Sequence, residues 1–250
     1  MTISLLLEMA ATETDRIAVV DGARRWSVSQ LDRLAGGGAS VVAASGARHV
    51  AYIGVGGAML PLLLFSSARA AIPFCPLNYR LSSEALSKLL GRLPSPLVVV
   101  DPQYRDVAGA LDAVEVLTSD QFMQRAEHSD PIEVTPSADD VAVVLFTSGT
   151  TAQPKAVELA HDNLFSYVMS TVGFASAAPD DAALVCVPPY HIAGVGAALS
   201  NLYAGRRLVY LPNFDPHEWI RLIGAERVTS ATVVPTMLDR IISVLETVPA

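Results

Sequence analysis

The feature that most limits the folds open to this chain is a series of short, continuous apolar runs rich in β-branched side chains. They recur with helical stretches between most of them, at residues 50–53, 97–100, 114–117, 141–146, 184–187, 207–211 and 229–234. A strand that is apolar on both faces must be buried on both faces, which parallel sheets achieve with a helix layer on each side. The sequence therefore predicts an α/β fold with mostly parallel sheets flanked by helices on both faces.

Two local signals add detail to this fold class. Ser27 and Gln30 have the spacing of a capping box, so a helix is expected to begin here. Asp21 followed by Gly22 favours a tight turn between two short strands. Residues 36–38 are three glycines inside the expected helix, and each costs about 1 kcal/mol relative to alanine. This helix must therefore be stabilised by close packing against a neighbour.

The charge of the chain limits its partners. Lys and Arg number 17 and Asp and Glu number 25, which gives a formal net charge of −8 at pH 7. The chain therefore has no overall positive potential that would attract nucleic acid or an anionic bilayer. We expect no nucleic-acid partner, and any anionic ligand has to be held by local groups.

Cysteine content and apolar patterning favour a cytoplasmic protein without a transmembrane segment. Cys75 and Cys186 are too few for a disulfide framework or a thiolate metal site, so we expect two buried thiols and no structural metal. Residues 50–68 and 182–205 lack charged side chains for long enough to imitate membrane spans. Glycine and proline interrupt both stretches, which instead predicts a buried strand, a turn and a buried helix in each.

The residues that carry chemistry follow the expected strand at 141–146. Residues 147–155, called the phosphate loop below, hold hydroxyls, a glycine and a lysine, namely Thr147, Ser148, Gly149, Thr150, Thr151 and Lys155. Backbone N–H groups in a tight turn, hydroxyl groups and an ammonium are donors that suit phosphate. The segment is therefore predicted to bind a phosphorylated ligand.

Lysine usage sharpens this prediction. Lys88 and Lys155 are the two lysines among 17 basic residues, and the others are arginine, so a lysine in the loop indicates a need for a compact ammonium. The loop is not a Walker A motif, because Pro154 and Ala156 stand where that motif has Gly and Ser or Thr. The chain also lacks the G-x-S-x-G and H-E-x-x-H motifs, which removes the serine-hydrolase and zinc-peptidase interpretations.

The phosphate loop resembles a known signature. Residues 146–157, FTSGTTAQPKAV, are similar to the phosphate-loop signature of adenylate-forming enzymes, the superfamily of acyl-CoA synthetases, nonribosomal-peptide adenylation domains and beetle luciferases. Three shorter stretches resemble further family segments in the family's order, at 26–31, 71–80 and 188–194. Asn78 with Arg80, together with the segment around His191, favours the AMP-forming acyl-CoA synthetases within this superfamily.

The resemblance implies a two-step reaction. A carboxylate, from a fatty acid or a related carboxylic acid, attacks the α-phosphorus of ATP to give an acyl-adenylate and pyrophosphate, and the thiol of coenzyme A then displaces AMP. By the family pattern, the β- and γ-phosphates of ATP are bound by Thr147, Ser148, Gly149, Thr150, Thr151 and Lys155. The pattern also implies that Thr147 contacts Mg²⁺ and that His191 and Gly194 border the pocket for the acyl group.

Some residues permit other interpretations or depart from the family pattern. Taken alone, a single histidine between apolar residues such as His191 is more often a hydrogen-bonded core group than a functional one. Ala152 and Ala156 stand where the family has glycine. If the backbone at Ala152 has to be left-handed, alanine costs on the order of 1 kcal/mol and ATP binding is weakened.

The resemblance covers the front half of such an enzyme. The family's adenine-contacting aromatic residue, ribose-binding aspartate, hinge and C-terminal catalytic lysine would follow residue 250. We therefore expect residues 1–250 to be an incomplete N-terminal domain, with subdomains at 1–160 and 161–250, without the C-terminal domain and inactive alone. A sheet that ends early exposes an edge, through which the chain is expected to form homo-oligomers.

A second hypothesis stays open on the sequence. The chain is then a non-catalytic remnant that binds a nucleotide or an acyl group, or an interaction module. Genomic sequence that continues in frame after Ala250 into a Thr-Glu motif and a Thr-Gly-Asp motif would favour the synthetase over the remnant.

Overall fold

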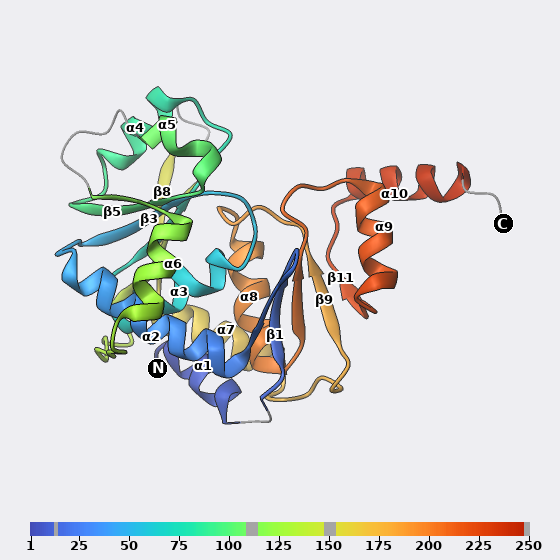
Figure 1. The fold of residues 1–250 in the computed structure, drawn as a ribbon, viewed down its shortest axis with the longest axis horizontal. Coiled ribbons are helices and arrows are strands. Elements are labelled where there is room, and N and C mark those ends of the chain that lie inside the picture. The colour runs from blue at the N-terminus through green and yellow to red at the C-terminus, as the bar shows by residue number, and fades with distance from the viewer. Residues whose placement is uncertain (13–14, 109–114, 148–153, 248–250) are drawn as a thin grey trace.

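The computed structural model describes residues 1–12, 15–108, 115–147 and 154–247, whose strands form two sheets (Figure 1). The larger sheet has the order β6-β5-β3-β4-β7-β8, with β6 at Val116–Thr118, β5 at Pro96–Val100, β3 at His49–Ile53, β4 at Phe74–Leu77, β7 at Val141–Thr147 and β8 at Lys155–Ala160. Its strand pairs are parallel, except that β7 and β8 form an antiparallel hairpin.

The smaller sheet brings together segments from both ends of the described chain. Its order is β11-β9-β10-β1-β2, with β11 at Ser230–Ala231, β9 at Ala182–Val185, β10 at Arg207–Tyr210, β1 at Ile17–Asp21 and β2 at Arg24–Ser27. β1 pairs in parallel with β10, where Val19 is opposite Leu208. A division into 1–160 and 161–250 would separate these paired strands, and that division stays a prediction.

Helices lie between the two sheets and on their outer faces (Figure 1). They are α1 at Ser4–Ala11, α2 at Val28–Ala44, α3 at Met59–Arg69, α4 at Ser83–Leu90, α5 at Arg105–Ala108, α6 at Ser119–His128, α7 at His161–Thr171, α8 at Ile192–Ala204, α9 at Pro216–Ala225 and α10 at Pro235–Thr247, with a 3-10 turn at Pro102–Tyr104. The predicted fold class, mostly parallel sheets covered by helices on both faces, is confirmed.

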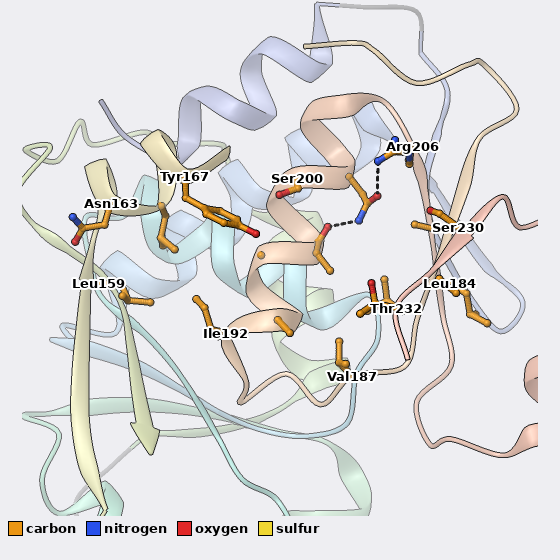
Figure 2. A pocket seen from close by; sticks show the side chains of 18 residues that line it. Leu159, Asn163, Tyr167, Leu184, Val187, Ile192, Ser200, Arg206, Ser230 and Thr232 are labelled. Carbon is orange, nitrogen blue, oxygen red and sulfur yellow. Dashed lines mark hydrogen bonds between the residues drawn. The ribbon is translucent and has the colours of Figure 1, made fainter. Parts of the chain in front are cut away.

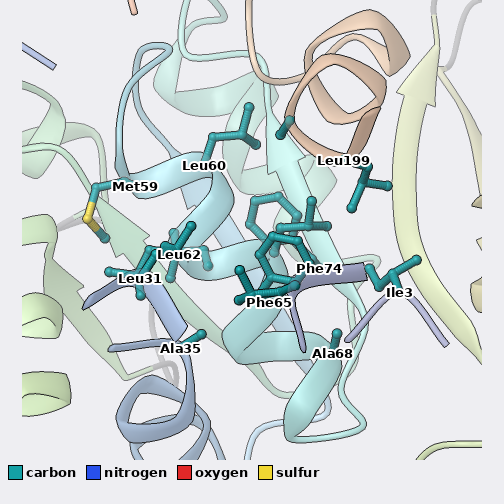
Figure 3. Close-up of a cluster of buried hydrophobic side chains, with 14 of the residues drawn as sticks. Ile3, Leu31, Ala35, Met59, Leu60, Leu62, Phe65, Ala68, Phe74 and Leu199 are labelled. Atoms are coloured by element: carbon teal, nitrogen blue, oxygen red, sulfur yellow. The ribbon is translucent and has the colours of Figure 1, made fainter. Parts of the chain in front are cut away.

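The main hydrophobic core lies between the sheets (Figure 3). Leu31 of α2, Phe65 of α3, Phe74 of β4 and Leu199 of α8 are all buried there, so the core joins residues from distant parts of the sequence. Two separate apolar clusters hold α4 against the outer face of the larger sheet and α9 against the outer face of the smaller one. Burial of apolar surface on both faces of each sheet is what fixes the helix layers.

The expected local signals are present. The N–H of Gln30 donates to Ser27 Oγ at 3.2 Å and the N–H of Ser27 donates to Gln30 Oε1 at 2.9 Å, which completes the capping box of α2. Gly22 has φ +59° in the turn after Asp21, a conformation that glycine adopts without a steric penalty. The predicted hairpin and helix start are therefore confirmed.

The three glycines of α2 lie where other segments approach the helix most closely. A Cβ atom at 36–38 would meet Pro131, the carbonyl oxygen of Ala126 and the hydroxyl of Ser66, respectively. These neighbours come from the segment after α6, from α6 and from α3. The close packing that the sequence required of this helix is therefore observed.

Besides shifts of two residues at β6 and β9, three strands differ from those expected. β4 and β8 were not predicted, and the run at 229–234 forms only the two-residue strand β11. β11 has a single neighbour, β9, and the chain leaves the sheet to begin α10 at Pro235, which is a favourable first helical residue. The last strand of the smaller sheet therefore ends at Ala231, although the apolar run continues to Val234.

The two long apolar stretches fold as predicted. Residues 50–68 form β3 and α3, and residues 182–205 form β9 and α8. Within the described residues, no helix combines the length and the apolar character needed to cross a membrane. Cys75 and Cys186 are free and buried, as expected.

Candidate functional site

The β7–β8 hairpin places the two ends of the phosphate loop opposite each other. Residues 142–145 of β7 are buried, and the strand ends at the exposed Thr147. Thr147 pairs with Lys155 in the ladder, and Thr147 Oγ1 donates to the Lys155 carbonyl oxygen at 3.5 Å. Ser148, Gly149, Thr150, Thr151 and Ala152 lie outside the described residues.

Lys155 is available for an anionic ligand. Its side chain is exposed at the first position of β8. Among the described residues no ion pair includes Lys155, whereas the other lysine, Lys88, pairs with Glu84 at 2.6 Å. The two lysines therefore differ, because Lys88 forms an ion pair on the surface of α4, whereas Lys155, the last residue of the phosphate loop, forms none with the described residues.

Arg92 contacts both flanks of the loop. It lies just after α4, and its Nη1 donates to the carbonyl oxygen of Pro154 at 2.7 Å. Its Cζ lies 4.9 Å from the centroid of the Phe146 ring, within the range of a cation–π contact. No periodic or motif signal in the sequence indicates this residue, because the contact joins segments that are 62 positions apart.

The two shorter family-like segments at 71–80 and 188–194 meet in space. Arg80 Nη1 donates to Tyr190 Oη at 3.0 Å, and the rings of Tyr79 and Tyr190 lie 5.8 Å apart between centroids. The ring of His191 lies 4.6 Å from that of Tyr190. His191 is exposed at the N-terminal cap of α8, so it is not the buried core histidine that residue statistics favoured.

Gly194 lies in the first turn of α8 and packs against the preceding turn. A Cβ atom at this position would lie 2.9 Å from the carbonyl oxygen of Pro188. The absence of a side chain thus lets the start of α8 approach the proline turn that carries His191. Neither His191 nor Gly194 is among the residues that line the cavity described next, although Ile192 and Ala193 are.

A cavity of about 780 Å³ lies between β8, α7, α8, β9 and β11 (Figure 2). This volume is within the range of small-molecule sites, roughly 300 to 1,000 Å³. Leu159 of β8 lines it, about 13 Å along the strand from Lys155 at roughly 3.3 Å per residue. On α8 the lining residues Ala193, Gly196, Ala197 and Ser200 are small and share one helix face. That small-residue spacing is the signal by which the sequence could have revealed the cavity.

The family model for AMP-binding enzymes matches residues 6–249. The chain belongs to this family. The predicted resemblance to adenylate-forming acyl-CoA synthetases is thereby confirmed at the level of the family.

The relatives of this AMP-binding family member include several acid–CoA ligases. A feruloyl-CoA synthase from Amycolatopsis sp. is 30% identical over 228 residues, which cover 90% of this chain and 46% of that protein. A 2-succinylbenzoate–CoA ligase from Bacillus pumilus is 31% identical over 175 residues, 70% of this chain and 36% of that protein. The chain thus spans about half or less of the length of the curated relatives it matches.

Solved structures of the family share the fold. The inhibitor-bound N-terminal domain of FACL13 from Mycobacterium tuberculosis matches with a TM-score of 0.88 and 25% identity, covering 99% of this chain and 65% of that one. ATP-bound MatB from Rhodopseudomonas palustris matches with a TM-score of 0.83 and 28% identity, covering 96% of this chain and 51% of that one.

Proposed function

We propose that the protein containing this chain is an AMP-forming acid–CoA ligase, in which residues 1–250 supply the phosphate loop and part of the acid-binding site. The observation that carries the proposal is the position of Thr147 and Lys155. Both are exposed, they are opposite each other in the β7–β8 ladder at the two ends of a hydroxyl-rich loop, and the same hairpin lines a cavity. The family match and the CoA ligases among the relatives support this reaction class.

The phosphate loop is proposed to bind the β- and γ-phosphates of ATP through Thr147, Ser148, Gly149, Thr150, Thr151 and Lys155. Positioning and charge neutralisation are most of what such a transfer requires from the protein, because the carboxylate attacks the α-phosphorus directly and pyrophosphate leaves. The ammonium of Lys155 supplies a fixed positive charge where the negative charge of the leaving pyrophosphate develops. The ATP-bound state of MatB supports a nucleotide as the ligand.

Mg²⁺ is proposed to bind at Thr147. The described residues contain no group of three or more His, Cys, Asp or Glu side chains that could hold a metal ion by themselves. A single hydroxyl together with phosphate oxygens and water suits Mg²⁺, which keeps several waters and rarely takes a dedicated protein cage. When bound, Mg²⁺ neutralises part of the phosphate charge.

The acid is proposed to occupy the cavity between β8, α7, α8, β9 and β11. Its carboxylate would face the end near Ile192, because His191 and the phosphate-loop hairpin are on that side. Under this proposal His191 borders the entrance, and Gly194 lets α8 approach the Pro188 turn that carries it. Coenzyme A is the proposed acceptor of the acyl group, as in the names of the relatives.

Two broader properties belong to the same proposal. The buried free thiols Cys75 and Cys186 support a reducing location such as the cytoplasm. Self-association is supported by the exposed edge strands β8 and β11, which present unpaired backbone groups to solvent.

The test is acid-dependent release of pyrophosphate from ATP by the complete gene product, over short, long and aromatic carboxylic acids. The proposal expects release that depends on one class of acid and yields AMP when coenzyme A is added. If ATP binds but no acid stimulates pyrophosphate release, the chain belongs to a non-catalytic member and the ligase assignment is wrong.

A further inference from the structure

Arg206 stands out among the residues that line the cavity. Within the described part of the chain it is the lining residue that carries a charge, and no ion pair there includes it. Apolar side chains such as Leu164 and Leu184 make up much of the lining, while Ser200, Asn201 and Ser230 line the end of the cavity where Arg206 lies (Figure 2). A guanidinium in such a place has donors without an anionic partner.

The backbone around Arg206 is fixed by the end of α8. Gly205 caps the helix with φ +90°, and the N–H of Arg206 donates to the carbonyl oxygen of Asn201 at 2.8 Å. The chain then enters β10 directly. Arg206 therefore projects from a rigid junction between a helix and a strand.

The side chain of Asn201 orients the guanidinium (Figure 2). Asn201 Nδ2 donates to the carbonyl oxygen of Ala197 at 2.8 Å, which leaves Oδ1 to accept from Arg206 Nη1 at 3.5 Å. This one long contact uses a small part of the five N–H groups of arginine. Among the described residues the other donors of this guanidinium have no hydrogen-bond partner, so they can face a ligand in the cavity.

The neighbouring arginine provides an internal contrast. Arg207 Nη2 donates to the carbonyl oxygen of Glu226 at 2.6 Å, and Arg207 does not line the cavity. Arg206 lies between the helix cap at Gly205 and the start of β10, whereas Arg207 is the first residue of β10, and of the two only Arg206 lines the cavity. A purely structural role for Arg206, as a cation beside the C-terminus of α8, would require no ligand.

Arg206 lies at the opposite end of the cavity from Ile192 (Figure 2). Ile192 begins α8 and Asn201, which contacts the guanidinium, is nine residues further along that helix. At roughly 1.5 Å per residue, the guanidinium is about 14 Å along the helix from the end where the reacting carboxylate is proposed to lie. An extended acid that fills the cavity would bring its far end to Arg206.

We propose that Arg206 binds a second anionic group of the acid, so that the preferred substrates are dicarboxylic acids whose far carboxylate pairs with this guanidinium. The inference rests on the proposed function, because it takes the cavity to hold the acid. Arginine binds a carboxylate through two parallel hydrogen bonds in a planar, bidentate arrangement. A monocarboxylic acid of the same length would instead place a methyl group against the charged side chain and leave its donors unpaired.

The experiment compares two acids of equal length with the purified complete gene product. Suberate and octanoate are titrated by calorimetry at constant ionic strength against the unaltered chain, Arg206→Gln and Arg206→Lys. We expect suberate to bind roughly 10- to 100-fold more tightly than octanoate, and Arg206→Gln to remove this difference without weakening octanoate. Arg206→Lys should keep part of the preference, because it keeps the charge but loses the planar fork.

Two further variants complete the test. Arg221→Gln, at an exposed arginine of α9 that pairs with Glu218, is the matched control and should leave the preference unchanged. Arg206→Glu should reverse the preference, so that 8-aminooctanoate binds more tightly than suberate. Circular dichroism of each variant verifies that the fold is retained.

The outcomes separate this inference from the proposed function. Octanoate that binds at least as tightly as suberate would show that Arg206 does not bind a second carboxylate. A preference for suberate that persists in Arg206→Gln would show the same. In both cases the cavity still binds acids. If no carboxylic acid binds to the chain, the assignment of the cavity to the acid fails as well.

Discussion

Arg92 donates to the carbonyl oxygen of Pro154 at 2.7 Å, and the same guanidinium lies over the ring of Phe146. One side chain thereby links the residue before the phosphate loop to the next-to-last residue of that loop. A loop that binds phosphate through backbone N–H groups depends on the placement of its ends, because the donors must converge on one ligand. Arg92 is therefore interpreted as a positioning residue for the loop.

Replacement of Arg92 by glutamine is expected to weaken binding of MgATP by roughly 3- to 10-fold. The change removes one charge-assisted hydrogen bond and one cation–π contact, each worth on the order of 1 kcal/mol. Calorimetric titration of MgATP measures the effect, with Arg221→Gln as a control at a distant exposed arginine. Equal affinities of Arg92→Gln and the unaltered chain for MgATP would show that the contacts of Arg92 with Pro154 and Phe146 have no role in nucleotide binding.

The glycines of α2 predict a contrast in stability. Gly37→Ala should lower the free energy of unfolding by about 3 kcal/mol, because the added methyl group would fall on the carbonyl oxygen of Ala126. Gly224 in α9 has open space around it, so Gly224→Ala should raise stability by up to about 1 kcal/mol through helix propensity. Urea denaturation measures both. A Gly37→Ala protein as stable as the Gly224→Ala protein would contradict the packing described for α2.

His161 predicts a dependence of stability on pH. Its side chain is 1% exposed, and Nδ1 accepts the N–H of Ile3 at 3.3 Å. Burial lowers the pKa of His161 below its usual value of 6.5; the nearby N-terminal amine also lowers it, while Asp140 raises it. The unfolded chain therefore takes up this proton at a higher pH than the folded chain does, so stability falls as the pH drops below about 6.5.

The measurement is the free energy of unfolding at pH 7.5 and pH 5.5 for the unaltered chain and for His161→Gln. The unaltered chain should lose up to about 1.4 kcal/mol more than the variant over this interval, the limit for one proton over one pH unit. His49, whose pKa burial also lowers, is present in both proteins, so its contribution cancels. Parallel pH profiles would mean that His161 does not titrate as its burial requires.

More of the fold than of the candidate site could be predicted from the sequence. The apolar run at 97–100 and the capping box at Ser27 are local patterns, and both were found as predicted. β4 was missed because Pro76 lacks the N–H of a normal ladder residue. The structure tolerates Pro76 because β7 pairs with β4 only at Phe74 and Val143, away from the proline.

In the candidate site, too, local motifs could be predicted from the sequence and contacts between distant segments could not. Thr147 and Lys155 were identified because a motif keeps them eight positions apart, whereas their pairing across a hairpin is a finding of the structure, since β8 was not predicted. No comparable motif marks Arg206, and the small residues along one face of α8 are a weaker signal of the cavity. Its walls come from five elements, of which β8 and α7 are consecutive in the chain while β9, α8 and β11 follow later, so the cavity depends on how these elements pack together.

An exposed apolar face on α10 predicts self-association. Leu238, Ile242 and Leu245 are 47%, 44% and 52% exposed and follow one face of the helix, which lies near the edge strand β11. Light scattering should show a molecular mass that rises with protein concentration, and Leu238→Glu with Ile242→Glu should reduce this rise. A monodisperse monomer at all concentrations would contradict the expectation of homo-oligomers.

The most direct test of the account compares the two lysines of the chain in binding to MgATP, by titration calorimetry and by ³¹P NMR of the β- and γ-phosphates. Lys155→Ala should weaken binding by roughly 10- to 100-fold, which is about 1.4 to 2.7 kcal/mol for one charge-assisted contact. Lys88→Ala, which removes the exposed partner of Glu84, should leave the affinity unchanged. Lys155→Ala protein that binds MgATP as tightly as the unaltered chain, with the same phosphate shifts, would show that the phosphate loop has been misassigned.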